Sequence, residues 1–468
     1  MSAETLSAGP GTGAADFMSL VDLDPSFFVL PLITLLGFLI PILYIFPPVP
    51  ATQSDCLSET HVRLGLPRAK SNLKDQHAPR HAGDASASDS KRATLQALSI
   101  YPIKSCRGIE LDRSRVLPTG LEFDRLYTFA QLKSPKPAAA DASEKPKTTT
   151  WDFITQRQFP LLATVKVDVW VPNPARRQAA GLLDEGKPGE SWIVLRFPWK
   201  ASGWKGTFQN AAAKLARGWR AVPETEILLP TAFPADWEVK DRGYVYEDVK
   251  IWKDVVTALN MKTDLPKELA QYLGVSNPLG LFRVDPGKLR NVYRCASTSE
   301  EAGYQPIVGF QDAYPLHLIS LGSLQDFGSM VPKDADLKQL DVQRFRANLI
   351  ISGSPAYDEE TWKSLRFKPG TSSLTGNAEF QVACRTVRCK MPNVDPQTGF
   401  RHRNEPDRSL RKFREVDEGA PKHGCMGMQV CPLFDDAGNV DSADLRTWVE
   451  VGMEIEVVER GDHLYIEQ

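Results

Sequence analysis

The sequence predicts a β-rich α+β protein that follows a single apolar helix, and three observations support this fold class. The chain has 468 residues, enough for two or three domains, and its 42% hydrophobic and 24% charged residues are ordinary for a globular protein. Residues 27–46 are apolar and carry no charge. From residue 94 onward, most apolar runs are short and rich in β-branched and aromatic residues, as in strands.

The apolar stretch at 27–46 is long enough to cross the hydrocarbon core of a bilayer, which takes about 20 residues. A buried core helix is the alternative, but Pro31, Pro41 and the absence of a polar face disfavour it. Residues 1–26 contain no Lys or Arg, unlike a cleaved mitochondrial presequence, and we expect them to be disordered. The sequence therefore predicts a single transmembrane anchor. The first basic residues follow it, so the positive-inside rule places the rest of the chain in the cytosol.

Two segments have the composition of flexible chain. Residues 47–93 are rich in Pro, Ser, Ala and Asp and are expected to form a linker, and the low-complexity segment 133–150 is expected to be a disordered insertion. Helices are expected at 266–273 and 316–328. Strands are expected at 95–103, 127–132, 163–171, 191–198, 345–353, 379–387, 453–459 and 463–467.

Charge and cysteine usage exclude several classes of protein. The net charge is −2, so the chain as a whole has no electrostatic affinity for nucleic acid, and no nucleic-acid partner is expected. The seven cysteines are few, odd in number and widely spread, which argues against a secreted disulfide framework and for a reducing compartment.

One cysteine carries the strongest chemical signal. Cys389 follows Arg388 at the end of a predicted strand and precedes a turn at 395–399. A strand end holds a side chain rigidly and can leave it accessible, and a neighbouring guanidinium favours the thiolate form. Cys389 is therefore a candidate metal ligand or nucleophile. The alternative is a four-cysteine zinc site that combines Cys389 with Cys384, Cys425 and Cys431. The sequence spacings between these cysteines are wider than is usual for zinc ligands, which disfavours such a site.

Two further clusters offer groups that bind anions. Lys104, Ser105 and Arg125 supply an ammonium, a hydroxyl and a guanidinium, a set that suits a phosphate. Arg346 and Asn348 lie at the polar end of the strand expected at 345–353. Taken singly, basic residues beside a strand are more often solvated than ligand-binding, so neither cluster identifies a site alone.

In their order along the chain, these clusters resemble the motifs of the MOSC-domain family, and within it the membrane-anchored mitochondrial amidoxime-reducing components. The resemblance covers about residues 95–458 and implies a MOSC-associated N-terminal β-barrel domain at 94–295 and a MOSC β-barrel domain at 296–468. The matching motifs are YPIKSCRG at 101–108, Asp-Arg at 124–125, ITQRQ at 154–158, FRAN at 345–348 and Arg-Cys followed by VDPQTG at 388–399.

The resemblance implies a molybdenum–molybdopterin cofactor, with Cys389 as the sulfur ligand that the protein gives to the metal. Binding of pyridoxal phosphate is not expected. Asp312 is the acid candidate beside the cofactor, with an ordinary surface carboxylate as the alternative. The residues implied to hold the pterin and its phosphate are Lys104, Ser105, Arg125, Arg346, Asn348, Arg388 and Cys389.

The activity that the resemblance implies is reduction of small N-hydroxylated compounds of the amidoxime or hydroxylamine type. The sequence has no Rossmann fingerprint, flavin motif or ferredoxin-like cysteine set, so a partner must supply electrons. In the family this partner is cytochrome b5 with NADH-cytochrome b5 reductase. The expected location is a lipid membrane, namely the mitochondrial outer membrane, with the endoplasmic reticulum membrane as the alternative. The alternative function is a membrane-tethered cofactor carrier or sulfur-delivery module without turnover of its own.

Two segments depart from the family pattern. Residues 312–315 read Asp-Ala-Tyr-Pro where the family usually has a Thr-Ser pair after the Asp. Gln429 stands where an aromatic residue is common. These changes leave the implied cofactor class intact and bear on substrate shape and on individual cofactor contacts.

Overall fold

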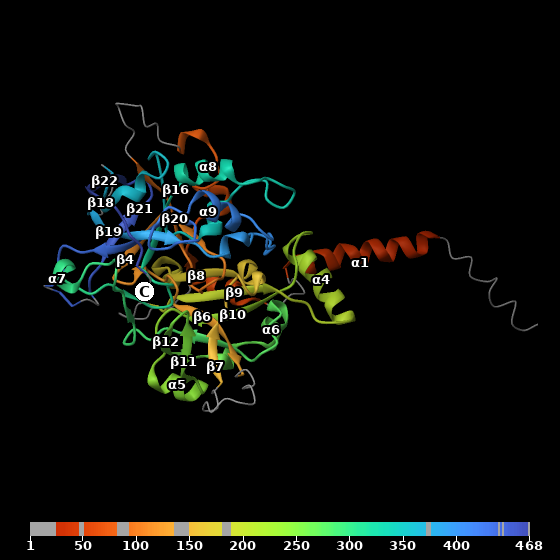
Figure 1. Cartoon of the computed structure of the whole chain (residues 1–468). Coiled ribbons are helices and arrows are strands. Elements are labelled where there is room, and N and C mark those ends of the chain that lie inside the picture. The colour runs from red at the N-terminus through yellow and green to blue at the C-terminus, as the bar shows by residue number, and fades with distance from the viewer. Residues whose placement is uncertain are drawn as a thin grey trace, which may run out of the picture. The chain divides into compact units, whose positions relative to one another are not determined.

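A computed structural model describes most of the chain (Figure 1). The chain forms two compact units, one made of residues 1–51 and 200–223 and the other of residues 52–199 and 224–468. Most of the predicted disorder, at 1–26 and 133–150, lies outside the described residues. The described residues are 25–45, 51–81, 93–134, 149–179, 189–370, 376–438, 440–441 and 444–466.

The described part of the first unit contains two helices, α1 (Pro25–Ile45) and α4 (Trp204–Arg217). The predicted apolar helix at 27–46 is thus present as α1. Crossing a bilayer requires about 20 consecutive apolar residues in helix. Within the described ranges, no helix combines the necessary length and apolarity, so the structure does not support the predicted transmembrane anchor.

The second unit contains a closed barrel of five strands in the order β11-β12-β13-β6-β7, closed by parallel pairing of β7 with β11. Its interior is packed with aromatic and aliphatic side chains, among them Trp151, Phe282 and Phe310. The strands are β6 (Tyr127–Lys133), β7 (Thr150–Phe153), β11 (Val245–Ile251), β12 (Asp254–Asn260) and β13 (Leu279–Arg283).

A larger sheet has the order β17-β16-β20-β19-β18-β22-β2-β3, and β17 also pairs with β2, so its strand pairing runs in a ring. Strands from both ends of the chain therefore build one core. The strands are β2 (Thr94–Ile100), β3 (Ile109–Leu111), β16 (Leu316–Ser320), β17 (Leu349–Ser352), β18 (Trp362–Lys368), β19 (Ala378–Val387), β20 (Cys425–Leu433) and β22 (Glu454–Arg460).

Smaller sheets and helices surround these two barrels. Helices α8 and α9 lie beside β16 and β20 (Figure 1). The remaining strands are β1 (His61–Arg63), β8 (Lys166–Pro172), β9 (Trp192–Pro198) and β10 (Glu224–Pro230) in one sheet, β4 (Arg113–Leu117), β5 (Gly120–Leu121) and β21 (Thr447–Glu450) in another, and the pair β14 (Arg290–Asn291) and β15 (Ile307–Val308). The other helices are α2 (Gln53–Ser58), α3 (Pro174–Ala179), α5 (Asp236–Arg242), α6 (Lys267–Leu273), α7 (Ser299–Ala302), α8 (Leu321–Met330) and α9 (Asp407–Phe413).

The segment predicted as a flexible linker is ordered over much of its length, so that prediction is wrong for residues 52–81. Thr52 caps α2 through a capping box, and β1 pairs with β8. The side chains of Leu57, Leu73 and His81 are buried. A few apolar residues in a polar segment are thus enough to attach it to the barrels, which its average composition conceals.

Most predicted strands are present, and so is one of the two helices predicted after residue 94. The helix at 266–273 corresponds to α6, but the helix predicted at 316–328 divides into β16 and α8. Residues 316–320 are a strand because β17 and β20 pair with them on either side. The predicted strand at 463–467 has no strand pairing in its described part, where the ring of His463 instead contacts the carbonyl of Trp362 at 2.7 Å.

Candidate functional site

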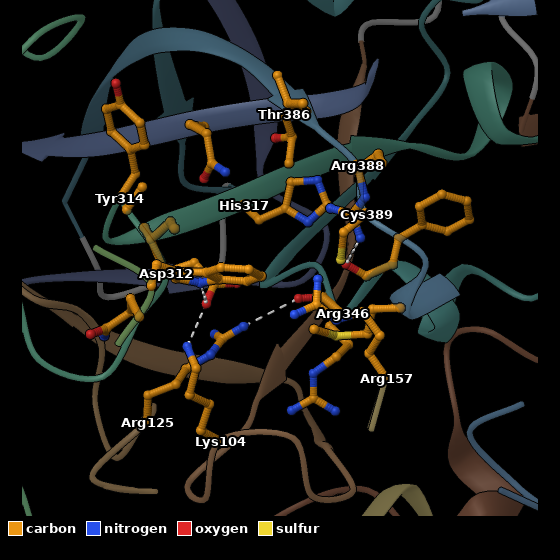
Figure 2. A pocket seen from close by; sticks show the side chains of 18 of the residues that line it. Lys104, Arg125, Arg157, Asp312, Tyr314, His317, Arg346, Thr386, Arg388 and Cys389 are labelled. Atoms are coloured by element: carbon orange, nitrogen blue, oxygen red, sulfur yellow. Dashed lines mark hydrogen bonds and ion pairs between the residues drawn. The ribbon is translucent and has the colours of Figure 1, made fainter. Parts of the chain in front are cut away.

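A cavity of about 740 Å³ opens in the second unit, between loops of the two barrels. All eight residues predicted for the site line it, although they extend from residue 104 to residue 389 of the sequence. Figure 2 shows most of their side chains around the same space. They are Lys104, Ser105, Arg125, Asp312, Arg346, Asn348, Arg388 and Cys389. The fold thus brings them together, and the role of each remains a prediction.

Cys389 lies just beyond the end of β19, as a partly buried free thiol. The turn predicted after it is present. The Asp395 carboxylate accepts hydrogen bonds from the backbone amides of Gln397 and Thr398, and Arg344 pairs with Asp395 at 2.9 Å. The loop that carries Cys389 is therefore fixed by the hydrogen bonds of its own turn and by the ion pair with Arg344.

Arg388 projects into the cavity beside Cys389. It donates one hydrogen bond to the carbonyl of Phe345 at 2.9 Å, and its guanidinium lies 5.2 Å from the Phe345 ring centroid. Burial lowers the pKa of Arg388. Its Nε is buried and has no hydrogen-bond partner in the described part of the chain. The same is true of the hydroxyl of Thr386, two residues earlier on β19.

Arg346 and Arg125 both lie over the ring of Tyr101, with guanidinium carbons 4.1 and 4.7 Å from its centroid. Arg346 donates from Nη1 to the carbonyl of Cys106 at 2.7 Å, whereas its buried Nη2 has no partner among the described residues. Burial, with the charge of Arg125, lowers the pKa of Arg346 to about 10. Arg346 therefore stays cationic at neutral pH.

Arg125 is held by two neighbours. It forms an ion pair with the buried Asp124 and donates to Oδ1 of Asn348 at 3.0 Å. The amide nitrogen of Asn348 in turn donates to Asp124 and to the carbonyl of Ser99. Asn348 uses its hydrogen-bonding groups within the protein, so its evident role is to orient Arg125.

Lys104 and Asp312 form an ion pair of 2.6 Å at the cavity wall. Lys104 also donates to the carbonyl of Phe310, and Trp252 donates from its indole to Asp312 at 2.9 Å. Burial lowers the pKa of Lys104. Desolvation by the surrounding cavity wall would raise the pKa of Asp312, but the charge and hydrogen bond of Lys104 and the indole of Trp252 outweigh it and hold that pKa well below its usual range. Asp312 is thus a carboxylate at neutral pH, and the predicted role as an acid does not fit this geometry.

Several cavity residues adopt left-handed backbone conformations that non-glycine residues rarely take. The φ angles are 68° at Ser105, 52° at Arg125, 55° at Trp252 and 54° at Arg346. Such strain persists only where the surrounding structure fixes it, and it clusters at functional sites. Here it fixes the directions of two of the arginines.

The cavity is also lined by residues that were not predicted for the site, and four of these are Trp252, His317, Thr386 and Arg157. Trp252 bonds Asp312 and carries the guanidinium of Arg157 at 4.9 Å from its ring centroid. His317 is buried, and burial together with the charge of Arg388 lowers its pKa well below the usual value, so its ring is neutral. Thr386 and Arg157 complete the set. Of these four, Arg157 lies within the ITQRQ motif and Thr386 lies two residues before Arg388, whereas Trp252 and His317 have no local sequence signal.

The described residues contain no group of three or more His, Cys, Asp or Glu side chains that could hold a metal ion. A metal at Cys389 would therefore need most of its ligands from a cofactor. Arg346, Arg388 and Thr386 line the cavity, and each carries a buried polar atom without a hydrogen-bond partner among the described residues. Two guanidinium groups at the cavity wall suit an anionic ligand. The residues present thus fit a molybdenum–pterin cofactor with a phosphate.

Two regions of the chain match known protein families. The model of the MOSC N-terminal beta barrel domain matches residues 92–201, and that of the MOSC domain matches residues 305–462. Mitochondrial amidoxime reducing component 2 of Bos taurus is 32% identical over 327 residues, which cover 69% of this chain and 73% of that protein. The chain belongs to the MOSC-domain family, with the amidoxime-reducing components as relatives. The two matched domains correspond to the mixed α+β, two-barrel fold.

Other relatives match over shorter parts of their length. Mitochondrial amidoxime reducing component 2 of Rattus norvegicus is 34% identical over 110 residues, 24% of this chain and 29% of that protein. Molybdenum cofactor sulfurase of Solanum lycopersicum is 22% identical over 379 residues, 78% of this chain and 36% of that protein. The relatives of this chain thus include proteins whose names describe different activities.

Proposed function

We propose that this MOSC-domain protein is a molybdenum-cofactor oxidoreductase that reduces N-hydroxylated compounds of the amidoxime or hydroxylamine type. One observation carries the proposal: a single accessible cysteine lies in a cavity lined by buried guanidinium groups with unused donors. The similarity to amidoxime-reducing components supports the same class of activity.

The chain's own residues would bind and orient the cofactor. Cys389 would give a soft thiolate to molybdenum, and Arg346 and Arg388 would donate to the anionic groups of the pterin. When bound, the cofactor supplies the two-electron chemistry that cleaves an N–O bond with two protons and releases water. The Lys104–Asp312 ion pair and the Trp252 indole would form a fixed wall of the cavity beside it.

Electrons would come from cytochrome b5 and NADH-cytochrome b5 reductase, because the sequence has no motif for a nicotinamide, flavin or iron–sulfur group of its own. We also propose a mitochondrial location, which the names of the relatives support. Both points are tested by reconstituting turnover with NADH and the two purified partners, and by locating the tagged chain in fractionated cells. Turnover with an artificial donor but none with cytochrome b5 would contradict this choice of partner.

The decisive variant is Cys389→Ser, because a hydroxyl is a poor substitute for a soft thiolate ligand. We expect it to abolish reduction of benzamidoxime by a chemical electron donor while thermal unfolding stays close to wild type. Cys384→Ser is the matched control, since Cys384 is fully buried and does not line the cavity. Retained turnover in the Cys389 variant would disprove the ligand assignment.

A second candidate function is a cofactor-binding or sulfur-carrier module without turnover. It is favoured by the similarity to molybdenum cofactor sulfurase and by the unusual 312–315 segment, where Tyr314 is buried beside Cys384 and Cys431. Metal content alone cannot separate the two functions. Purified protein that carries molybdenum and pterin but reduces no N-hydroxylated compound with a chemical donor would establish this alternative.

A further inference from the structure

Helix α4 belongs to a long insertion between two paired strands. β9 and β10 pair antiparallel without interruption, from Trp192 opposite Pro230 to Pro198 opposite Glu224. The connection 199–223 is far longer than the 2–5 residues usual for a hairpin, and long ordered connections are often functional. The match to the MOSC N-terminal domain ends at residue 201. The strands do not need α4 in order to pair, so another requirement determines its sequence.

The helix buries its smallest residues. Gly206, Ala212 and Ala213 are buried, and a side chain at Gly206 would collide with the backbone of Ala201. A helix that stabilises its own fold normally turns its large apolar residues inward. In α4 this arrangement is reversed, so its large apolar residues do not serve the packing of the protein itself.

The large apolar residues of α4 form one exposed stripe. Trp204, Phe208 and Leu215 are 76%, 59% and 61% exposed, and at about 100° per residue they fall within an arc of about 40°. Trp219, just beyond the helix, is 82% exposed. We call these four residues the α4 stripe. Three large side chains aligned on one helix face, with a fourth directly after it, are not a random scatter of surface residues.

Positive charge surrounds the α4 stripe. At the same angular spacing, Lys205 and Lys214 lie on opposite sides of it, and the Lys214 ammonium lies 4.8 Å from the Trp219 ring centroid. Residues 200–223 contain no Asp or Glu. The cations of this segment are Lys200, Lys205, Lys214, Arg217 and Arg220.

An apolar stripe of Trp, Phe and Leu bordered by cations is the pattern of a helix that lies in the surface of an anionic membrane. Tryptophan side chains favour the headgroup region, and each nearby Lys or Arg adds attraction to anionic lipid. We propose that the α4 stripe docks on the surface of an anionic lipid bilayer. This inference concerns a surface in the first unit and does not depend on the chemistry of the cavity.

The size of the face favours a bilayer over an acidic protein. α4 has 14 residues and is therefore about 21 Å long, so one face about 10 Å wide offers about 200 Å². A stable protein interface needs about 800 Å² from each partner and shape complementarity as well. A lipid surface needs neither, because aromatic side chains enter it individually.

Helix α5 provides an internal comparison. It also exposes a tryptophan, Trp237, which is 71% exposed. Its three acidic residues outnumber its two basic ones, Lys240 and Arg242, so α5 has no net positive charge to attract anionic lipid. An exposed tryptophan on a helix without net positive charge is thus present in the same protein, and it supplies a matched control.

The test uses the full chain and vesicles of phosphatidylcholine and phosphatidylserine with brominated acyl chains, which quench nearby tryptophan fluorescence. Residues 1–51 contain no Trp, so α1 gives no direct signal. We expect quenching in the wild type, loss of most of it in the double variant Trp204→Phe/Trp219→Phe, and no change in Trp237→Phe. Wild-type quenching that survives in the double variant, or absence of quenching, would overturn the proposal.

Charge variants test the electrostatic part. Lys205→Ala with Lys214→Ala should raise the lipid concentration at half-maximal quenching about 25-fold, at about fivefold per cation. Lys333→Ala with Lys338→Ala, two exposed lysines of the second unit, should change nothing. Equal quenching by pure phosphatidylcholine vesicles would contradict the choice of an anionic surface. Binding of the α4 stripe to an acidic soluble protein while it ignores vesicles would replace the bilayer as the partner.

Discussion

Replacing Asp312 with asparagine separates its structural role from a role as an acid. The change keeps the size of the side chain and removes the charge that pairs with Lys104 at 2.6 Å. Lys104 is only 6% exposed, so its ammonium loses its main compensation in a nearly buried position. The carbonyl of Phe310 remains as an acceptor.

The expected loss of stability in Asp312→Asn follows from the partial exposure of the ion pair. A hydrogen bond to a charged group stabilises by about 1.5–3 kcal/mol. The Asp312 side chain is 50% exposed, and solvent screening therefore favours the lower end, about 1.5 kcal/mol. Such a loss lowers the melting temperature by about 3–6 °C for a domain of this size.

The contribution of Asp312 to folding stability depends on pH with a defined sign. The folded-state pKa of Asp312 lies below its unfolded value, so the carboxylate stabilises the fold fully above about pH 4. That contribution is lost as the pH falls through the folded-state pKa. The difference in unfolding free energy between wild type and Asp312→Asn should be constant from neutral pH to about pH 5 and shrink below pH 4.

The assay is urea unfolding over this pH range, with the exposed Asp336→Asn as the control, together with a pH–rate profile of reduction. If Asp312 is a paired carboxylate, the variant keeps the shape of the pH–rate profile. Loss of a limb of that profile, without loss of stability at neutral pH, would refute the assignment and restore Asp312 as an acid.

Three other changes test the site and its supports. Arg346→Ala removes a charge-assisted donor and should lower the amount of pterin bound to the purified protein about tenfold or more. The bound pterin is measured by its fluorescence after release. Full occupancy in the variant would exclude Arg346 from the cofactor pocket. Deleting residues 1–51 should leave the urea midpoint of the second unit unchanged. Deleting 1–93 should lower that midpoint, because the free energy of unfolding falls by about 2 kcal/mol for each buried leucine lost. Equal midpoints of the two deletions would contradict the ordering of residues 52–81. Gly120→Ala should lower the free energy of thermal unfolding by about 1–3 kcal/mol, since φ is 109° and the new Cβ would lie 2.6 Å from the Pro315 carbonyl oxygen. The control Gly370→Ala, whose Cβ would lie in open space, should lower it little. Similar losses in the two variants would argue against this packing.

The sequence predicted the membership of the site better than its internal contacts. The motifs around Lys104, Arg346 and Cys389 carry functional groups at strand ends and tight turns, and a fold that brings those ends together brings the groups with them. By contrast, Trp252 has no motif around it, and only the tertiary structure brings it to the cavity. The pairing of Lys104 with Asp312 is equally invisible along the chain, because the partners come from separate loops.

The errors in the fold have related causes. Residues 316–328 contain enough apolar positions to suit either a strand or a helix, and only the neighbouring strands decide where β16 ends and α8 begins. Residues 52–81 have a polar average composition, yet the burial of Leu57 and Leu73 attaches them to the second unit. Composition averages over a segment, whereas packing depends on a few side chains in it.

The structure also ranks the cations of the cavity, which the sequence treated as equivalent. Asp312 neutralises Lys104, and Asp124 neutralises Arg125, so these two charges are largely balanced within the protein. Arg346 and Arg388 have no such carboxylate among their described hydrogen-bond partners, and each retains a buried nitrogen without an acceptor. Leaving such a donor unsatisfied is costly, so an anion bound in the cavity would gain most from these two arginines. Their replacement should therefore reduce cofactor retention more than replacement of Lys104, even though all three line the same cavity.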